Sequence, residues 1–187
     1  MVLLLSLLIL KGGVIMELEK VINERYSVRK FSNKEIEQEK LNKILEAGRI
    51  APTACNFQPQ RIFVIKSKEA KEKLKSICKM TFDAPVILLA CADMTKSWKN
   101  RREEGYDSAE MDVSIVGTQM MLEAWNLEIG SCWVRAFNSN DVKGVLELPE
   151  NIKPIFLMPI GYMTNESVPN KELHYTRNKM EDMVEYI

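Results

Sequence analysis

Two unbroken apolar runs constrain the fold of this chain more than any other feature. They are APVILLACAD, at residues 84–93, and KPIFLMPIGYM, at residues 153–163. Neither run shows the alternation expected of a strand with one solvated face. Runs of this length and composition are typical of β-strands that are buried on both faces. A chain with two such strands needs packing partners on each side of its sheet.

Shorter patterns divide the rest of the chain into helices and strands. Ser32 and Glu35 match a capping box, so a helix is expected to begin near residue 33 and to run to Gly48. Residues 107–127 are apolar nearly all round a helix, which predicts a long helix buried on several sides. The polar residues 94–106 are interpreted as a lid or a surface insertion. Further helices are expected at residues 17–24, after a cap at Ser67 and after a cap at Ser139 or Asn140, and residues 178–186 look weakly helical. Strands are expected at residues 61–66 and 131–137.

The alternation of strands and helices indicates an α/β or α+β fold with a mixed sheet. With 187 residues the chain is expected to form one domain, spanning residues 16–187. Four strands make a small sheet for this length, and the long helix needs more cover than such a sheet supplies. A homodimer would provide that cover through an obligate interface of roughly 2,000–5,000 Å².

Residues 1–15 begin with MVLLLSLLIL, an apolar run that is too short to span a bilayer. No basic segment precedes this run, and no convincing small-residue cleavage site follows it. We interpret Met16 as the natural start and residues 1–15 as an apolar extension without a function. A degenerate signal peptide and an arm that docks on the core are the alternatives.

Charge and cysteine content argue against several classes of partner. The chain carries 26 basic and 26 acidic residues, so nothing global favours nucleic acid or an anionic membrane. No pair among the four cysteines has Cys-x-x-Cys spacing, and the single histidine, His174, is far from all of them, which argues against a metal site. Cys78, Cys91 and Cys132 lie in apolar stretches and are expected to be reduced thiols of a cytoplasmic protein.

The segment ERYSVRKF, at residues 24–31, concentrates positive charge. If its backbone is extended, Arg25, Ser27 and Arg29 point the same way, because side chains alternate along a strand. Two guanidinium groups beside a hydroxyl suit a phosphate, which requires charge and several donors. The alternative is a solvated basic patch in front of a helix.

The loop APTACNFQPQR, at residues 51–61, is more elaborate than a short connection requires. Its prolines fix φ, and Asn56 and Gln58 each offer a donor and an acceptor, which suits the edge of a flat heterocycle. The alternative is an Asx-type turn in which Asn56 satisfies its own backbone. The segment IGSCWVRAF, at residues 129–137, could line one face of a cofactor, or it could be a core strand with Trp133 packed inside.

Groups for classical catalysis are scarce. One histidine gives little support for a Ser-His-Asp or Cys-His arrangement, and the sequence contains no Rossmann or Walker glycine motif. If the chain is an enzyme, a bound cofactor is therefore expected to carry the chemistry.

Four motifs, taken in order, resemble those of the FMN-dependent nitroreductase family. They are Arg25–Phe31 (RYSVRKF), for an Arg-x-Ser-x-Arg-x-Phe pattern; Ala51–Pro59 (APTACNFQP), for an Ala-Pro-Ser-x-x-Asn-x-Gln-Pro loop; Gly130–Phe137 (GSCWVRAF); and Ile160–Tyr162 (IGY). The similarity runs from about Glu17 to the end of the chain. It departs from the family at Gln60, where tryptophan is common, and in the tail TRNKMEDMVEY, which lacks a proline.

The resemblance implies an α+β fold, a three-layer sandwich around a mixed central sheet, in an intertwined homodimer with FMN at the interface. The implied contacts to the phosphate and ribityl end are Arg25, Tyr26 through its backbone, Ser27, Arg29 and Arg177, with Lys179 a further candidate. The implied contacts to the flavin are Pro52, Thr53, Ala54 and Asn56 from the partner subunit, together with Trp133, Val134 and Arg135.

The activity that the resemblance implies is an oxidoreductase with two half-reactions. NADH or NADPH would deliver hydride to FMN N5, and a nitroaromatic, a quinone or a similar small-molecule acceptor would then take the electrons. No protein residue is expected to be catalytic in itself. The alternatives are a flavin-binding sensor or carrier with little turnover, and flavin destruction or dehalogenation. The sequence leaves open the acceptor, the NADH or NADPH preference, the number of electrons per step and whether Cys55 faces the flavin.

Overall fold

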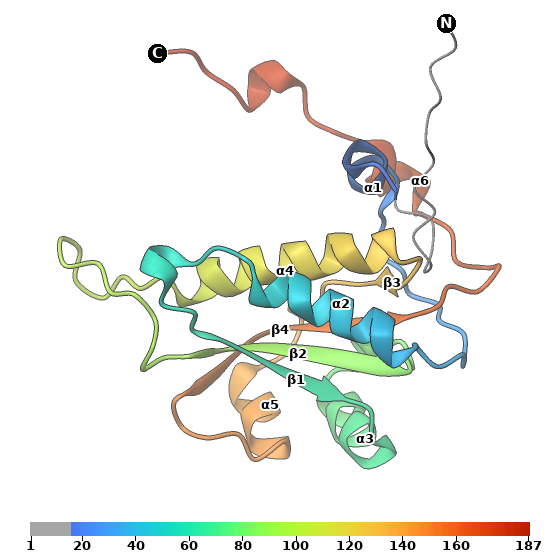
Figure 1. The fold of residues 1–187 in the computed structure, drawn as a ribbon, viewed down its shortest axis with the longest axis horizontal. Coiled ribbons are helices and arrows are strands. Elements are labelled where there is room, and N and C mark those ends of the chain that lie inside the picture. Colours follow the sequence, from blue (N-terminus) through green and yellow to red (C-terminus); the bar gives the residue numbers. More distant parts are fainter. Residues whose placement is uncertain (1–15) are drawn as a thin grey trace, which may run out of the picture.

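The computed structural model describes residues 16–187, and the expectations for residues 1–15 lie outside the described part of the chain. Figure 1 shows helices packed on a small sheet, an α+β fold. The strands β1 (Gln60–Ile65), β2 (Val86–Asp93), β4 (Ile152–Gly161) and β3 (Gly130–Ser131) lie side by side in that order. All three strand pairs are antiparallel.

The expectation of a mixed sheet is therefore wrong for the strands themselves. A turn at residues 79–85 returns the chain to the end of the sheet that it has just left, so Ile65 of β1 pairs with Ile87 of β2. Between residues 16 and 187, the one parallel pairing is an isolated bridge from Ser27 to Ser131.

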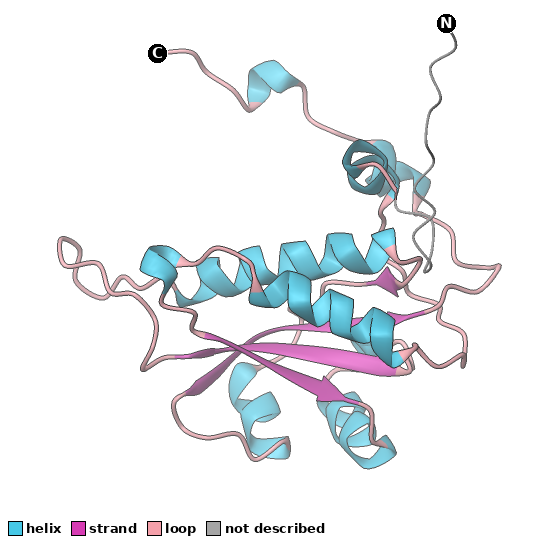
Figure 2. Ribbon diagram, viewed as in Figure 1, coloured by secondary structure: helices cyan, strands magenta, loops and turns pink. Residues whose placement is uncertain are grey.

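Helices cover both faces of this sheet (Figure 2). Helices α2 (Gln38–Arg49) and α4 (Ala109–Asn126) lie on one face, and α3 (Lys68–Ile77) and α5 (Ser139–Val145) lie on the other. Strand β2 supplies both cores: Leu88, Ala90 and Ala92 pack towards α2 and α4, whereas Ile87, Leu89 and Cys91 pack towards α3 and α5. The prediction of a strand buried on both faces is confirmed.

Helix α4 matches the predicted long helix, and it packs closely against α2. A Cβ added at Gly48 of α2 would lie 2.7 Å from Met120 Cγ, so any larger residue here would displace the Met120 side chain. Near its amino end α4 has an uncovered side in the described chain, where Met111 is more than half exposed, whereas α1 packs on its carboxyl end. No helix among residues 16–187 is both long enough and apolar enough to cross a membrane.

Helix α2 begins at Gln38, so the predicted start near residue 33 is wrong. Ser32 Oγ does accept a weak bond from the Lys34 N–H (3.4 Å), but the Ser32 N–H donates to the Tyr162 carbonyl (2.8 Å). That long-range bond keeps the chain extended, and Ile36 enters the core before the helix starts. The Ser67 cap of α3 is confirmed by the Ala70 N–H bond to its hydroxyl, whereas α5 is capped by Asn138 instead of Ser139 or Asn140.

The predicted strand at 131–137 is wrong for most of its length. Cys132 donates to the Pro159 carbonyl (3.2 Å), but proline has no N–H to return the bond, so the ladder stops there. Only Val134 regains a bridge, to Leu157.

Helices α1 (Leu18–Glu24) and α6 (Lys171–Tyr175) both lie near the carboxyl end of α4, where Tyr26, which follows α1, meets Trp125 of α4 and His174 of α6 edge-on (Figure 1). Helix α1 matches its prediction, and α6 was not expected. The segment 178–186 holds only a single 3₁₀ turn, Met180–Asp182, so its expected helix is wrong.

Candidate functional site

The basic segment after α1 forms a cavity with the C-terminal part of the chain. Residues 25–29 are extended, and Ser27 bridges to Ser131 of β3. As expected from alternation, Arg25, Ser27 and Arg29 face the same cavity, and Arg177, 152 positions after Arg25 in sequence numbering, closes it. Its volume is about 190 Å³, and its remaining lining residues are Tyr26, Asn170, Leu173 and His174.

This cavity is cationic without a matching anion. Among residues 16–187, no carboxylate forms an ion pair with Arg25, Arg29 or Arg177. Burial lowers the Arg25 pKa, and the charge of Arg177 lowers it further. Arg25 bears this cost beside two further guanidinium groups, an arrangement that favours a multiply charged oxyanion. Arg25 is half-buried, whereas Arg29 and Arg177 lie exposed at the rim of the cavity.

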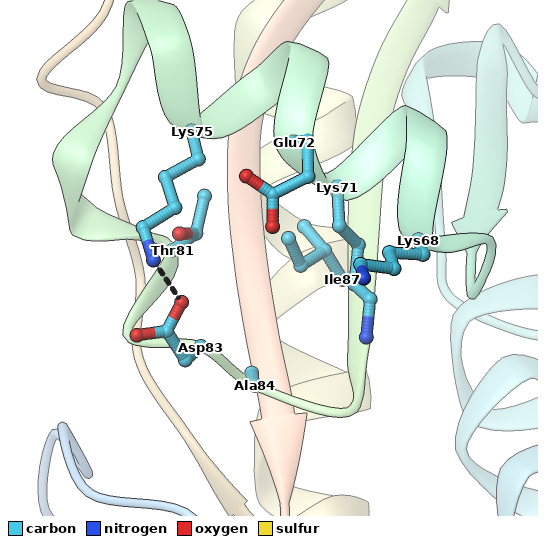
Figure 3. A pocket seen from close by; sticks show the side chains of 8 residues that line it. All are labelled: Lys68, Lys71, Glu72, Lys75, Thr81, Asp83, Ala84 and Ile87. Carbon is cyan, nitrogen blue, oxygen red and sulfur yellow. Dashed lines mark hydrogen bonds and ion pairs between the residues drawn. The ribbon is translucent and has the colours of Figure 1, made fainter.

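A second basic cavity shows the contrast (Figure 3). It measures about 140 Å³ and lies between α3 and the turn that follows it. There, Lys75 is neutralised by Asp83 at 2.6 Å, and Glu72 adds another negative charge. Two carboxylates offset two of the three lysines that line this cavity, whereas none faces the arginines in the described chain, so the arginine cavity is the stronger anion site.

Tyr26 anchors the arginine cavity to the rest of the domain. Its hydroxyl donates to the Ser167 carbonyl (2.7 Å), and its ring meets Trp125 edge-on at 5.2 Å. Sequence reasoning missed His174, which lies edge-on to Tyr26, and Cys132, whose thiol lies beside Ser27. Burial raises the Cys132 pKa, although Arg29 and Ser27 oppose that rise. The available sequence signal for His174 was Asn170, which caps the short helix that carries this histidine.

The loop at residues 51–59 has a strained backbone. Cys55, Asn56 and Gln58 have φ of 49°, 58° and 52°, in the left-handed region that non-glycine residues rarely adopt. The Gln58 N–H is satisfied by Thr53 Oγ1 (3.0 Å). The Asn56 side chain makes no hydrogen bond within the described chain, so the alternative, an Asx-type turn, does not form and this exposed amide faces outward.

The loop and the arginine cavity lie at opposite ends of α4. Ala54 is bonded to Asp112 in the first turn of α4, and Tyr26 packs on Trp125 in its last turn. Those two attachments are about 20 Å apart at 1.5 Å per residue. One copy of the chain therefore does not bring Pro52, Thr53, Ala54 and Asn56 to the arginines.

The side chains of Trp133, Val134 and Arg135 diverge. Trp133 stacks on Phe156 of β4 (3.7 Å between centroids) on the α4 face, whereas Val134 is buried in the core on the α5 face. Arg135 donates to the Phe137 carbonyl (3.1 Å) and to Ser139 Oγ (3.3 Å). Trp133 thus packs with one face on the core and remains partly exposed. Gln60, which replaces the tryptophan common in the resembling family, has its side-chain oxygen buried without a partner in the described chain.

Comparison with known proteins tests the family resemblance. A family model described as "Nitroreductase family" matches residues 22–83 and 75–162. An FMN reductase [NAD(P)H] of Bacillus subtilis strain 168 is 26% identical over 174 residues, covering 84% of this chain and 70% of that protein.

Two solved structures are also similar. A nitroreductase family protein from Clostridium difficile 630 is 36% identical, with a TM-score of 0.85 over 91% of this chain and 98% of the other. An FMN-dependent nitroreductase from Clostridium difficile R20291 is 24% identical, with a TM-score of 0.68 over 87% and 98% of the two chains, a likeness of fold.

Proposed function

The chain belongs to the nitroreductase family, and on that premise we propose that it is an NAD(P)H-dependent oxidoreductase with FMN as its cofactor. The observation that carries this proposal is the convergence of Arg25, Arg29 and Arg177 with no carboxylate partner in the described chain. A phosphate monoester supplies the missing negative charge, and the relatives' names support FMN as its source.

The cavity fits the phosphate end of FMN. Arg25, Arg29 and Arg177 would bind the phosphate oxygens, Ser27 would donate its hydroxyl, and the backbone of Tyr26 would contact the ribityl chain. A cavity of about 190 Å³ is too small for the whole cofactor, so the ring would lie outside it. Trp133, Val134 and Arg135 follow Ser131, which is bridged to Ser27, and the backbone or side chains of this segment would contact the ring.

The chemistry supplied by bound FMN is hydride acceptance from NADH or NADPH and electron transfer to a nitroaromatic, quinone or similar acceptor. The protein's part is to hold the cofactor, orient it and leave one face accessible. We further propose a cytoplasmic location, because Cys78, Cys91 and Cys132 are buried and free.

We propose that residues 16–187 form a single domain that assembles as an intertwined homodimer, each copy a three-layer sandwich. Several apolar side chains are more than half exposed: Leu18 and Ile22 on α1, Ile50 directly after α2, and Met111 on α4. A groove of about 380 Å³ lies among these helices. Apolar exposure on this scale is typical of an interface. A second copy would also supply the loop residues Pro52, Thr53, Ala54 and Asn56, which one copy keeps away from the arginines.

The C-terminal segment supports the intertwined arrangement. Met180, Met183 and Tyr186 are more than two-thirds exposed, and Figure 1 shows the segment leading away from the sheet. Apolar side chains that contact so little of their own chain are suited to packing on another copy.

Ending the chain at Asn178 is expected to convert the dimer to a monomer and to weaken FMN binding, because the lost segment would pack on the partner. Light scattering after gel filtration and FMN fluorescence quenching measure the two effects. Glu181→Ala, which removes only an exposed ion pair with Lys179, is the control and should remain dimeric. A shortened chain that stays dimeric would exclude the proposed arm.

The proposed activity is tested by purifying the protein and titrating it with FMN, then reducing the holoenzyme anaerobically with NADH and with NADPH. Quenching of FMN fluorescence and rapid bleaching are expected, followed by reoxidation with nitroaromatics or quinones. A protein that fails to bind FMN contradicts the proposal. Very slow bleaching by both nucleotides would favour a flavin sensor or carrier.

A further inference from the structure

Asp112 is a buried carboxylate that no sequence motif identified. It lies in the first turn of α4 and is 2% exposed. Oδ1 accepts the Ala54 N–H (2.8 Å), and Oδ2 accepts the Ser108 hydroxyl (2.6 Å). Both oxygens are therefore used, one on the loop at 51–59 and one at the start of the helix.

The bond to Ala54 has a special position in this loop. Every other hydrogen bond of residues 53–58 within the described chain is internal to that segment, such as Asn56 N–H to the Thr53 carbonyl and Gln58 N–H to Thr53 Oγ1. Among residues 16–187, the bond from the Ala54 N–H to Asp112 is the one hydrogen bond that joins the segment to the domain. It adjoins Cys55 and Asn56, whose positive φ values cost energy and persist only when surrounding contacts enforce them.

Ser108 holds the carboxylate in turn. Its hydroxyl donates to Asp112, and its N–H donates to the Trp98 carbonyl (3.0 Å), at the base of the loop that precedes α4. Ser108 is 3% exposed, so water does not compete readily for this bond. The result is a fixed chain of contacts from Trp98 through Ser108 and Asp112 to Ala54.

We propose that Asp112 is a positioning residue for FMN binding, which fixes the strained loop so that Ala54 and Asn56 are presented to the flavin of the partner subunit. This inference rests on the proposed function. A preformed loop avoids the cost of ordering on binding, so loss of the carboxylate should reduce cofactor affinity although Asp112 does not touch the cofactor.

The test compares three variants of the full-length protein. Asp112→Ala removes both bonds, and the dissociation constant of FMN should rise about tenfold. Asp112→Asn keeps an oxygen for the Ala54 N–H and an amide for Ser108, so its affinity should remain within threefold of wild type. The matched control is Asp93→Ala: Asp93 is also buried, but its side chain bonds Thr95 and Asn151 instead of the loop.

Two readouts separate positioning from general destabilisation. Asp112→Ala and Asp93→Ala should both lower the melting temperature. Only Asp112→Ala should weaken FMN binding and speed amide hydrogen exchange across residues 51–60. Equal FMN affinity in Asp112→Ala and wild type overturns the inference. If Asp112→Ala does not fold, Ser108→Ala decides, because it frees Oδ2 and should raise the FMN dissociation constant about threefold; an unchanged constant overturns the inference. Failure of the wild-type protein to bind FMN would refute the proposed function, and hydrogen exchange would still report on the loop.

Discussion

Arg25→Ala is expected to weaken FMN binding by about 1.5–3 kcal/mol, or roughly 10- to 150-fold, because a charged hydrogen bond to phosphate is lost. Arg25 is the right test because it is half-buried and faces Arg177 inside the cavity. Fluorescence titration with FMN measures the change. Riboflavin, which lacks the phosphate, should bind the variant and the wild type equally.

Arg177→Ala should weaken FMN binding without lowering the stability of the FMN-free protein. The pKa of Arg25 is lowered by burial and by the charge of Arg177, so its charged form is disfavoured in the folded state at every pH below that pKa. At neutral pH, the FMN-free Arg177→Ala variant should therefore be at least as stable as the FMN-free wild type, although its affinity for FMN is lower. Arg49→Ala, at an exposed arginine paired with Glu46, is the control and should change neither property appreciably. Unaltered FMN affinity in Arg25→Ala would remove Arg25 from the site.

Local patterns predicted the parts of the fold that depend on local chemistry. The double-sided burial of β2 is visible in its own sequence, and Ser67 caps α3 as its position suggests. Where the sequence misled, a distant group competed. The Ser32 N–H bonds the Tyr162 carbonyl, and no helix begins at the capping box. The expected strand after Ser131 ends because Pro159, which lies opposite Cys132, has no N–H to donate. Neither competitor is near in sequence.

The candidate site divides in the same way. Arg25, Ser27 and Arg29 share a face because they alternate along five residues, which a sequence can reveal. Arg177 entered through the family resemblance, and the cavity brings it to the other three. Asp112 could not be found, because its bond to Ala54 spans 58 positions and depends on how the loop crosses the start of α4. The separation of the loop from the arginines likewise follows from the length of α4.

Gly117→Ala is expected to lower the free energy of unfolding by about 2 kcal/mol, which is the usual range for overpacking a core. A Cβ at this position of α4 would lie 2.3 Å from Phe156 Cζ and 2.6 Å from Trp133 Cζ3. These two rings are stacked, and Phe156 is fully buried, so Phe156 cannot make room without opening the core. The gain in helix propensity from glycine to alanine, about 1 kcal/mol, is too small to offset the clash.

Gly144→Ala is the matched control, because Gly144 also lies within a helix, α5, but a Cβ there meets nothing within 4 Å. That variant should be more stable than wild type by up to about 1 kcal/mol. Urea unfolding measures both, and Phe156→Leu in the Gly117→Ala background should restore part of the loss by making room for the methyl group. Since Trp133 would be displaced, Gly117→Ala should also change the tryptophan fluorescence and weaken FMN binding. Wild-type stability in Gly117→Ala would mean that the helix and the sheet separate easily at this point, and Trp133 would then not be held in the position from which it is proposed to contact the flavin.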